Sequence, residues 1–97
     1  MIPSRVRNPK EILAEAITTV RTAAAGLRLT SEGDLVPISA VHREFSIIAG
    51  VFTIRTALML AQRDEVRLNA ELLTAASLLE KEHGQTADAF KERARRV

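Results

Sequence analysis

The chain has 97 residues, a formal net charge of +2 at pH 7 and no cysteine. This length accommodates one small domain, which buries about 60–65% of the surface of its unfolded chain and has a narrow stability margin. Without cysteine, disulfides and the cysteine-containing zinc, haem c and redox motifs are excluded. Hydrophobic residues make up 46% of the chain but aromatic residues only 3%, so the core must consist of Leu, Ile, Val and Ala, a composition typical of helical proteins.

The first predicted helix begins at residue 9. Asn8 is a favourable N-cap, Pro9 suits the first helical position and Glu11 occupies the third, where a capping-box acid belongs. The apolar residues that follow recur at helical spacing and form one stripe: Leu13, Ile17, Val20, Ala24 and Leu27. We expect a turn over residues 31–34, in which Gly33 is free to adopt a positive φ.

A much longer second helix is predicted to begin near residues 37–39. No proline or glycine interrupts residues 51–83, and Gly84 is a natural stop signal after them. Gly50 lies inside this helix and indicates a close approach to another helix. The alternative is a break near Asp64, whose side chain is suited to cap a new helix.

Two apolar stripes run along this long helix, both with the 4-3 spacing of coiled-coil seams. The first contains Val41, Phe45, Ile48, Phe52, Arg55, Met59, Gln62 and Val66. The second contains Ile47, Val51, Ile54, Leu58, Ala61, Glu65, Leu68, Leu72, Ala75 and Leu79. Because the first helix can cover only one stripe, we expect self-association through an interface that includes Val41, Phe45, Ile48, Phe52 and Leu58. The alternative is an intramolecular three-helix arrangement, if the long helix breaks near Asp64.

Arg55 interrupts the first stripe. Either it forms an ion pair between chains with Glu44 or Glu65, or its guanidinium extends to solvent at the edge of the seam. Glu80 and His83 have the Glu-x-x-His spacing of di-iron bundles, but a full site needs two such motifs and two further glutamates. We therefore predict no metal, no cofactor and no catalytic residue, with a metal-binding bundle as the enzymatic alternative.

Both ends of the chain are basic. The first ten residues contain Arg5, Arg7 and Lys10, and the last seven contain Lys91, Arg93, Arg95 and Arg96. The residues between them carry a net negative charge. We expect the two ends, together with Phe90, to contact a protein partner or, weakly and without sequence preference, DNA. The alternative is that they only keep the protein soluble.

Residues 86–97 are predicted to form a short third helix or a frayed end. If helical, they place Phe90, Ala94 and Val97 on one small apolar face with a basic rim. This pattern favours a segment that docks onto a partner. The competing interpretation is that Phe90 folds back onto residues 78–79 of the long helix.

No targeting segment is recognisable in the sequence. The most apolar run, residues 47–61, is shorter than a membrane span and contains Arg55. We therefore expect a cytoplasmic protein with no membrane partner.

One block of the sequence carries a pattern shared with a known family. It contains Leu27-Arg28-Leu29, then Glu32-Gly33-Asp34-Leu35-Val36-Pro37, Val41 and Phe45, and finally Arg55, Leu58, Leu60 and Arg63. This block, residues 25–68, resembles the central region of phage small terminase subunits, where a helix ends in a Gly-(Glu/Asp)-Leu-Val turn and a long helix follows. Family members usually begin with a helix-turn-helix domain, which this sequence does not show, and Leu60-Ala61-Gln62-Arg63 stands where the family has Leu-Pro-x-Arg. The chain therefore resembles a gene-transfer-agent small terminase that lacks the DNA-reading domain.

These patterns together predict an all-α fold: a helical hairpin of one medium and one long helix plus a short C-terminal helix, assembling as a coiled-coil-like oligomer. The predicted parts are a basic arm over residues 1–8, an oligomerisation domain over 9–84 and a basic segment over 85–97. The resemblance implies a non-enzymatic adaptor of DNA packaging, a homo-oligomer and expected ring, that recruits and stimulates a large terminase with little or no DNA sequence specificity. The alternative function is a small helical regulator of the antiactivator type that sequesters a transcription factor.

Overall fold

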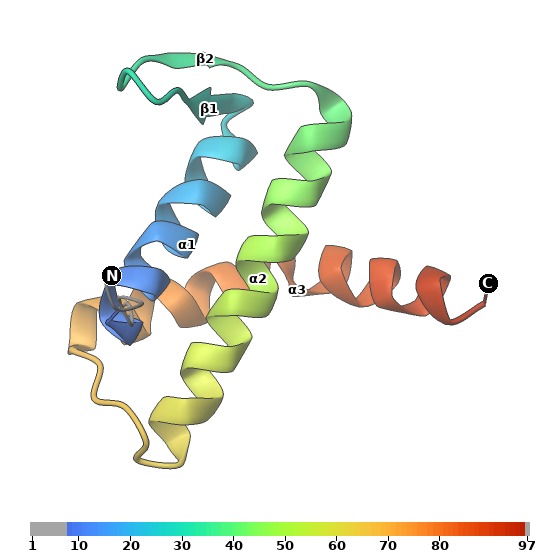
Figure 1. The fold of residues 1–97 in the computed structure, drawn as a ribbon. Coiled ribbons are helices and arrows are strands. Elements are labelled where there is room, and N and C mark those ends of the chain that lie inside the picture. Colours follow the sequence, from blue (N-terminus) through green and yellow to red (C-terminus); the bar gives the residue numbers. More distant parts are fainter. Residues whose placement is uncertain (1–7, 97) are drawn as a thin grey trace, which may run out of the picture.

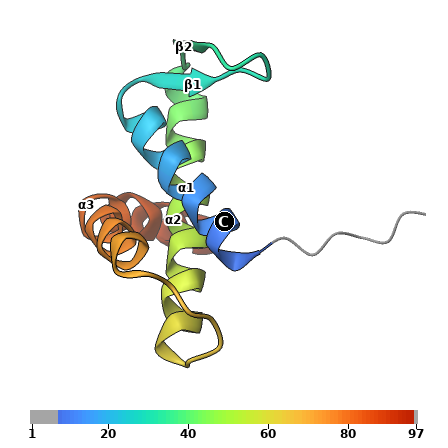
Figure 2. The same ribbon diagram turned by 90° about the vertical axis from the view of Figure 1, so that its left-hand side faces the viewer.

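The structure, a computed structural model, describes residues 8–96. This part of the chain contains, in order, α1 (Pro9–Ala24), β1 (Leu27–Leu29), β2 (Leu35–Pro37), α2 (Ala40–Gln62) and α3 (Ala70–Arg95). Figure 1 shows α1 beside α2, the two strands at one end of this pair, and α3 crossing behind α2. Figure 2 shows the same crossing from the side. The prediction of a mostly helical small protein is confirmed, whereas the strands and the long C-terminal helix differ from the predicted topology.

Helix α1 begins as its sequence predicts. The Asn8 side chain accepts a hydrogen bond from the Lys10 backbone N–H at 2.9 Å. The stripe residues Leu13, Ile17 and Val20 are buried. The helix ends because Gly26 adopts a φ of +82°, a conformation that stops helices readily.

A short β-hairpin joins α1 to α2. Strands β1 and β2 pair antiparallel, with Leu27 opposite Pro37 and Leu29 opposite Leu35. The predicted turn is confirmed, and Gly33 has a φ of +90°. Across the turn, the Thr30 N–H donates to the Asp34 carbonyl at 2.8 Å. The hairpin reverses the chain, so α2 starts beside the end of α1.

The prediction of one helix over residues 37–83 is wrong, and the alternative break near Asp64 is confirmed. Helix α2 ends at Gln62, and Asp64 has a left-handed φ of +60°. Asp64 does not cap the next helix. That role belongs to Asn69, whose side chain accepts a hydrogen bond from the Leu72 N–H at 2.8 Å.

The helix stop predicted at Gly84 is also wrong. Helix α3 continues through Gly84, which is buried, to Arg95. Residues 86–95 therefore form the last part of α3 and no separate element. Helix α3 is consequently long enough to cross α2 and continue on the other side of it (Figure 1).

Two clusters of buried side chains hold the helices together. The larger one draws on all three helices and contains Leu13, Ala16, Ile17, Val20, Ile54, Ala57, Ala76 and Leu79. The smaller one contains Ala23, Ile47, Val51 and Ala87, with Ile38 and Phe52 packed against it. The three-helix arrangement within one chain is therefore the observed one. Helix α3 supplies much of the covering surface whose shortage led us to expect self-association.

Candidate functional site

The five residues predicted as an oligomer interface do not share one environment. Ile48 is only 4% exposed, and Leu58 packs against the larger core cluster. Phe52 packs against the smaller cluster. Of the five, Val41 and Phe45 are the most exposed, at 66% and 59%, and Phe52 and Leu58 are partly buried within the chain.

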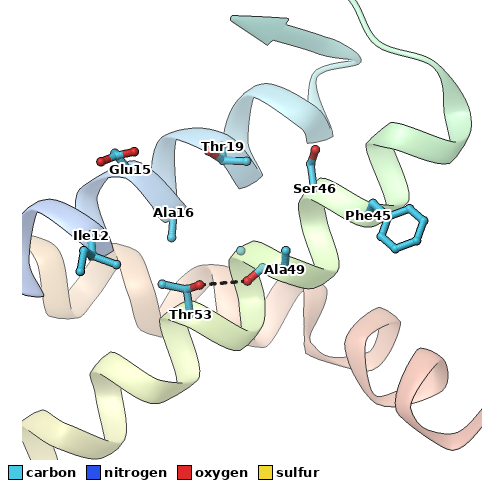
Figure 3. Close-up of a pocket in the computed structure, with 9 residues that line it drawn as sticks. Ile12, Glu15, Ala16, Thr19, Phe45, Ser46, Ala49 and Thr53 are labelled. Carbon is cyan, nitrogen blue, oxygen red and sulfur yellow. Dashed lines mark hydrogen bonds between the residues drawn. The ribbon is translucent and has the colours of Figure 1, made fainter. Parts of the chain in front are cut away.

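Phe45 separates two hollows on the surface. On one side, a shallow groove between α1 and α2 is lined by residues that include Ile12, Ala16, Ala49 and Thr53. Figure 3 shows this groove, with the Phe45 ring pointing away from α1. On the other side lies a small notch lined by Val41, Glu44, Phe45, Ile48 and Phe90. We call the exposed apolar residues at this place, Ile12, Val41, Phe45 and Ala49, the Phe45 surface.

Gly50 determines how closely α1 and α2 approach beneath this groove. A Cβ at Gly50 would overlap Val20 Cγ2 and lie 3.4 Å from the Ala16 carbonyl oxygen. Any larger residue would force the Val20 side chain to move. The close helix approach predicted at Gly50 is therefore confirmed.

Arg55 forms an ion cluster with α3, which neither predicted interpretation includes. Its Nε donates to Glu80 Oε2 at 2.8 Å and its Nη1 to Asp88 Oδ1 at 2.9 Å. Its Nη2 donates to the Gly84 carbonyl at 3.2 Å. The hydrogen bonds with Glu80 and Asp88 raise the pKa of Arg55, and the bond from Arg55 lowers the pKa of Asp88. Within this chain Arg55 contacts neither Glu44, which pairs with Arg93, nor Glu65.

Glu80, one of the two residues of the Glu-x-x-His motif, is part of this ion cluster. Glu80 bonds to Arg55, whereas His83 Nε2 lies 3.8 Å from Glu82 Oε2. Among residues 8–96, no group of three or more His, Cys, Asp or Glu side chains is arranged to hold a metal ion.

The basic residues that we predicted to contact a partner or DNA lie at two separate ends of the described structure. Lys10 is exposed at the start of α1, and Lys91, Arg95 and Arg96 are exposed at the end of α3. Figure 1 shows these two ends on opposite sides of α2. Arg5 and Arg7 lie outside the described residues.

Phe90 and Arg93 instead contact α2. The Phe90 and Phe45 rings meet edge to face with centroids 6.4 Å apart. Arg93 Nη2 lies 2.7 Å from Glu44 Oε1. Phe90 therefore packs within the chain against Phe45 of α2, and because α3 is one continuous helix it does not fold back onto residues 78–79.

The hairpin presents an apolar face that our sequence analysis missed. Leu29 and Leu35, paired across the strands, are 58% and 59% exposed. The signal was two short segments rich in apolar residues, Leu27-Arg28-Leu29 and Leu35-Val36-Pro37, on either side of a glycine turn. Three-residue strands are too short for such a pattern alone to identify them.

Helix α2 also has the length and composition of a membrane span. Its 23 residues include an 18-residue window with a mean hydropathy of 1.5, of which 33% is buried in the structure. A core helix of a soluble protein meets the same criterion.

In comparisons with known proteins, the chain matches no protein-family model, no curated protein and no solved structure.

Proposed function

We propose that this protein is a non-enzymatic adaptor of DNA packaging that resembles a small terminase subunit. In this proposal it self-associates, recruits a large terminase and stimulates its ATPase and nuclease activities with little or no DNA sequence specificity. The single observation that carries the proposal is the exposure of Val41 and Phe45, one turn apart on α2. Large apolar side chains grouped beside a groove are typical of protein–protein contact sites.

The residues that carry the resemblance to small terminases lie in the same part of the chain as Val41 and Phe45. Residues 25–68 include the hairpin, all of α2 and most of the loop before α3. Helix α2 therefore carries both the family-like pattern and three residues of the Phe45 surface, Val41, Phe45 and Ala49. The exposed cations Lys91, Arg95 and Arg96 supply the proposed contact with DNA or with an acidic surface of the large terminase. They are few for one chain, so assembly into an oligomer is what would make the contact effective.

A second candidate is a small helical regulator that sequesters a transcription factor. The observation that favours it is the coverage of Ile48 and Phe52 within one chain. Because these side chains of the apolar stripe are covered within one chain, less apolar surface remains to drive self-association. The Phe45 surface would then receive a helix of the transcription factor.

The mass of the native particle separates the two candidates. Native mass spectrometry of the 10.7 kDa chain should show a particle of about eight or more subunits if it is a small terminase. A monomer or dimer would favour the regulator. The activity test adds the purified protein to the large terminase of the same genome, with a Phe45→Asp variant as the matched control. We expect the wild type, but not the variant, to raise the ATPase rate, and no effect of the wild type would contradict the proposal.

A further inference from the structure

The two halves of α3 are attached to the rest of the molecule in different ways. In residues 70–83, Ala76 and Leu79 are buried in the larger core cluster, and Leu72 and Ala75 pack against it. In residues 85–95, Ala87 is the only buried residue in this described segment. The first half is therefore held by several side chains of the larger cluster, whereas the second half contributes one buried residue, Ala87, to the smaller cluster.

Besides Ala87, two charge pairs and one ring contact attach the second half to α2. Asp88 bonds to Arg55, and Arg93 bonds to Glu44 at the N-terminal end of α2. The side chains of Asp88, Arg93 and Glu44 are 63%, 64% and 49% exposed. Water and dissolved ions screen such pairs strongly, so each stabilises the closed position only slightly.

Gly84 lies at the junction of the two halves. Glycine in a helix interior is less favourable than alanine and is a frequent site of helix bending. The Gly84 carbonyl also accepts the hydrogen bond from Arg55 at 3.2 Å, which helps to hold the junction in place. Opening at Gly84 breaks no contact of the larger core cluster.

We infer that residues 85–95 form a hinged strap that closes over Ile47, Val51 and Phe52 and opens as one unit at Gly84 when ionic strength weakens its charge pairs. Closure buries Ala87 against Ile47 and Val51 and brings Phe90 onto Phe45. Opening uncovers this side of α2, which is continuous with the Phe45 surface. The strap is a property of the chain itself, and it does not depend on the proposed function.

Amide hydrogen exchange of the full chain tests the strap. We expect amides of residues 87–95 to exchange at least about tenfold faster than those of residues 75–83, because they open without the core. Raising the salt concentration from about 0.05 M to about 1 M should speed exchange in the strap several-fold and leave residues 75–83 unchanged. Uniform protection along α3, or a strap that does not respond to salt, would overturn the inference.

Two matched variants separate the ion pairs from a general effect of charge. Asp88→Asn removes a pair of the strap, whereas Glu92→Gln removes one negative charge from the same segment without touching α2. We expect faster exchange in residues 87–95 for Asp88→Asn at low salt, a smaller response to added salt because only the Arg93–Glu44 pair remains, and wild-type behaviour for Glu92→Gln. Arg93→Gln should reproduce the effect of Asp88→Asn. Identical exchange in all three variants would show that the charge pairs do not hold the strap.

Discussion

Arg55 on α2 donates a hydrogen bond to the backbone carbonyl of Gly84 in the interior of α3, at 3.2 Å. A Cβ at position 84 would lie 2.8 Å from Glu80 Oε1 and 3.2 Å from Arg55 Nη2, so the glycine makes room for the guanidinium. Glu80 and Asp88, one turn before and one turn after Gly84, accept the other two bonds. One planar cation therefore connects three acceptors on one face of α3.

Replacing Arg55 with lysine should lower the free energy of unfolding by about 1 kcal/mol, because an ammonium group cannot reach three separated acceptors at once. Urea unfolding followed by circular dichroism measures the change. Arg95→Lys is the matched control, since Arg95 is exposed at the end of α3 and takes no part in the cluster. Equal midpoints for wild type and Arg55→Lys would show that the cluster adds nothing to stability.

Acid should weaken the same cluster through Asp88. The hydrogen bond from Arg55 lowers the pKa of Asp88 below its ordinary value of 3.8, so the folded state binds this proton less readily than the unfolded state. The contribution of Asp88 to stability is therefore complete above pH 3.8 and is lost as the pH falls through the lowered folded value. We expect the stability difference between wild type and Asp88→Asn to shrink between about pH 5 and about pH 2. A difference that stays constant over this range would place the effect of the substitution elsewhere.

Local signals in the sequence predicted the local features of the fold. The N-cap at Asn8, the turn at Gly33 and the close approach at Gly50 each depend on one residue and its immediate neighbours. The break after Gln62 is different, because the residues around it are neither glycine nor proline. It forms because folding back lets α3 bury Ala76 and Leu79 against the other helices.

The error at Gly84 and the differing environments of the predicted interface residues have the same physical origin. Gly84 looks like a helix stop, but the reason for a glycine there is an arginine 29 residues away. Ile48 and Phe52 look available to a second chain until α3 crosses α2. Phe45 has the same spacing in the stripe and remains exposed, so the pattern alone could not separate these residues. Their burial depends on contacts distant in sequence.

The contact between Gly50 and Val20 predicts a non-additive pair of substitutions. Gly50→Ala should destabilise the chain by about 1–2 kcal/mol, because the new methyl group overlaps the Val20 side chain. The cost of this overlap exceeds the stability that alanine gains over glycine through its higher helix propensity. Val20→Ala, which leaves a cavity in the core, should cost about 2–3 kcal/mol. We expect the double variant to be more stable than the sum of the two effects predicts, as measured by urea unfolding. Strict additivity would show that the helices move apart to accommodate the methyl group.

Binding to duplex DNA should be weak, indifferent to sequence and strongly dependent on salt. Replacing Lys91, Arg95 and Arg96 with glutamine should make the slope of log K against log salt shallower by about 2–3. Arg28, Arg63 and Arg67 are also exposed and serve as a control triple of equal charge, for which we expect a smaller change. Fluorescence anisotropy with two unrelated duplexes measures both slopes. Tight, sequence-selective binding at physiological salt would contradict this prediction.

Phe45→Asp should abolish self-association while leaving the chain folded. Phe45 is 59% exposed, so the aspartate carboxylate stays hydrated and the main loss within the chain is the ring contact with Phe90, about 0.5–1 kcal/mol. Ile48→Asp, one turn away but only 4% exposed, should instead unfold the chain because it buries an unpaired charge. Leu29→Asp is the matched surface control, since Leu29 is 58% exposed on the hairpin. Light scattering over a range of concentrations gives the mass, and circular dichroism confirms folding. If Leu29→Asp dissociates the particle and Phe45→Asp does not, the contact between copies lies on the hairpin and the role proposed for the Phe45 surface is wrong.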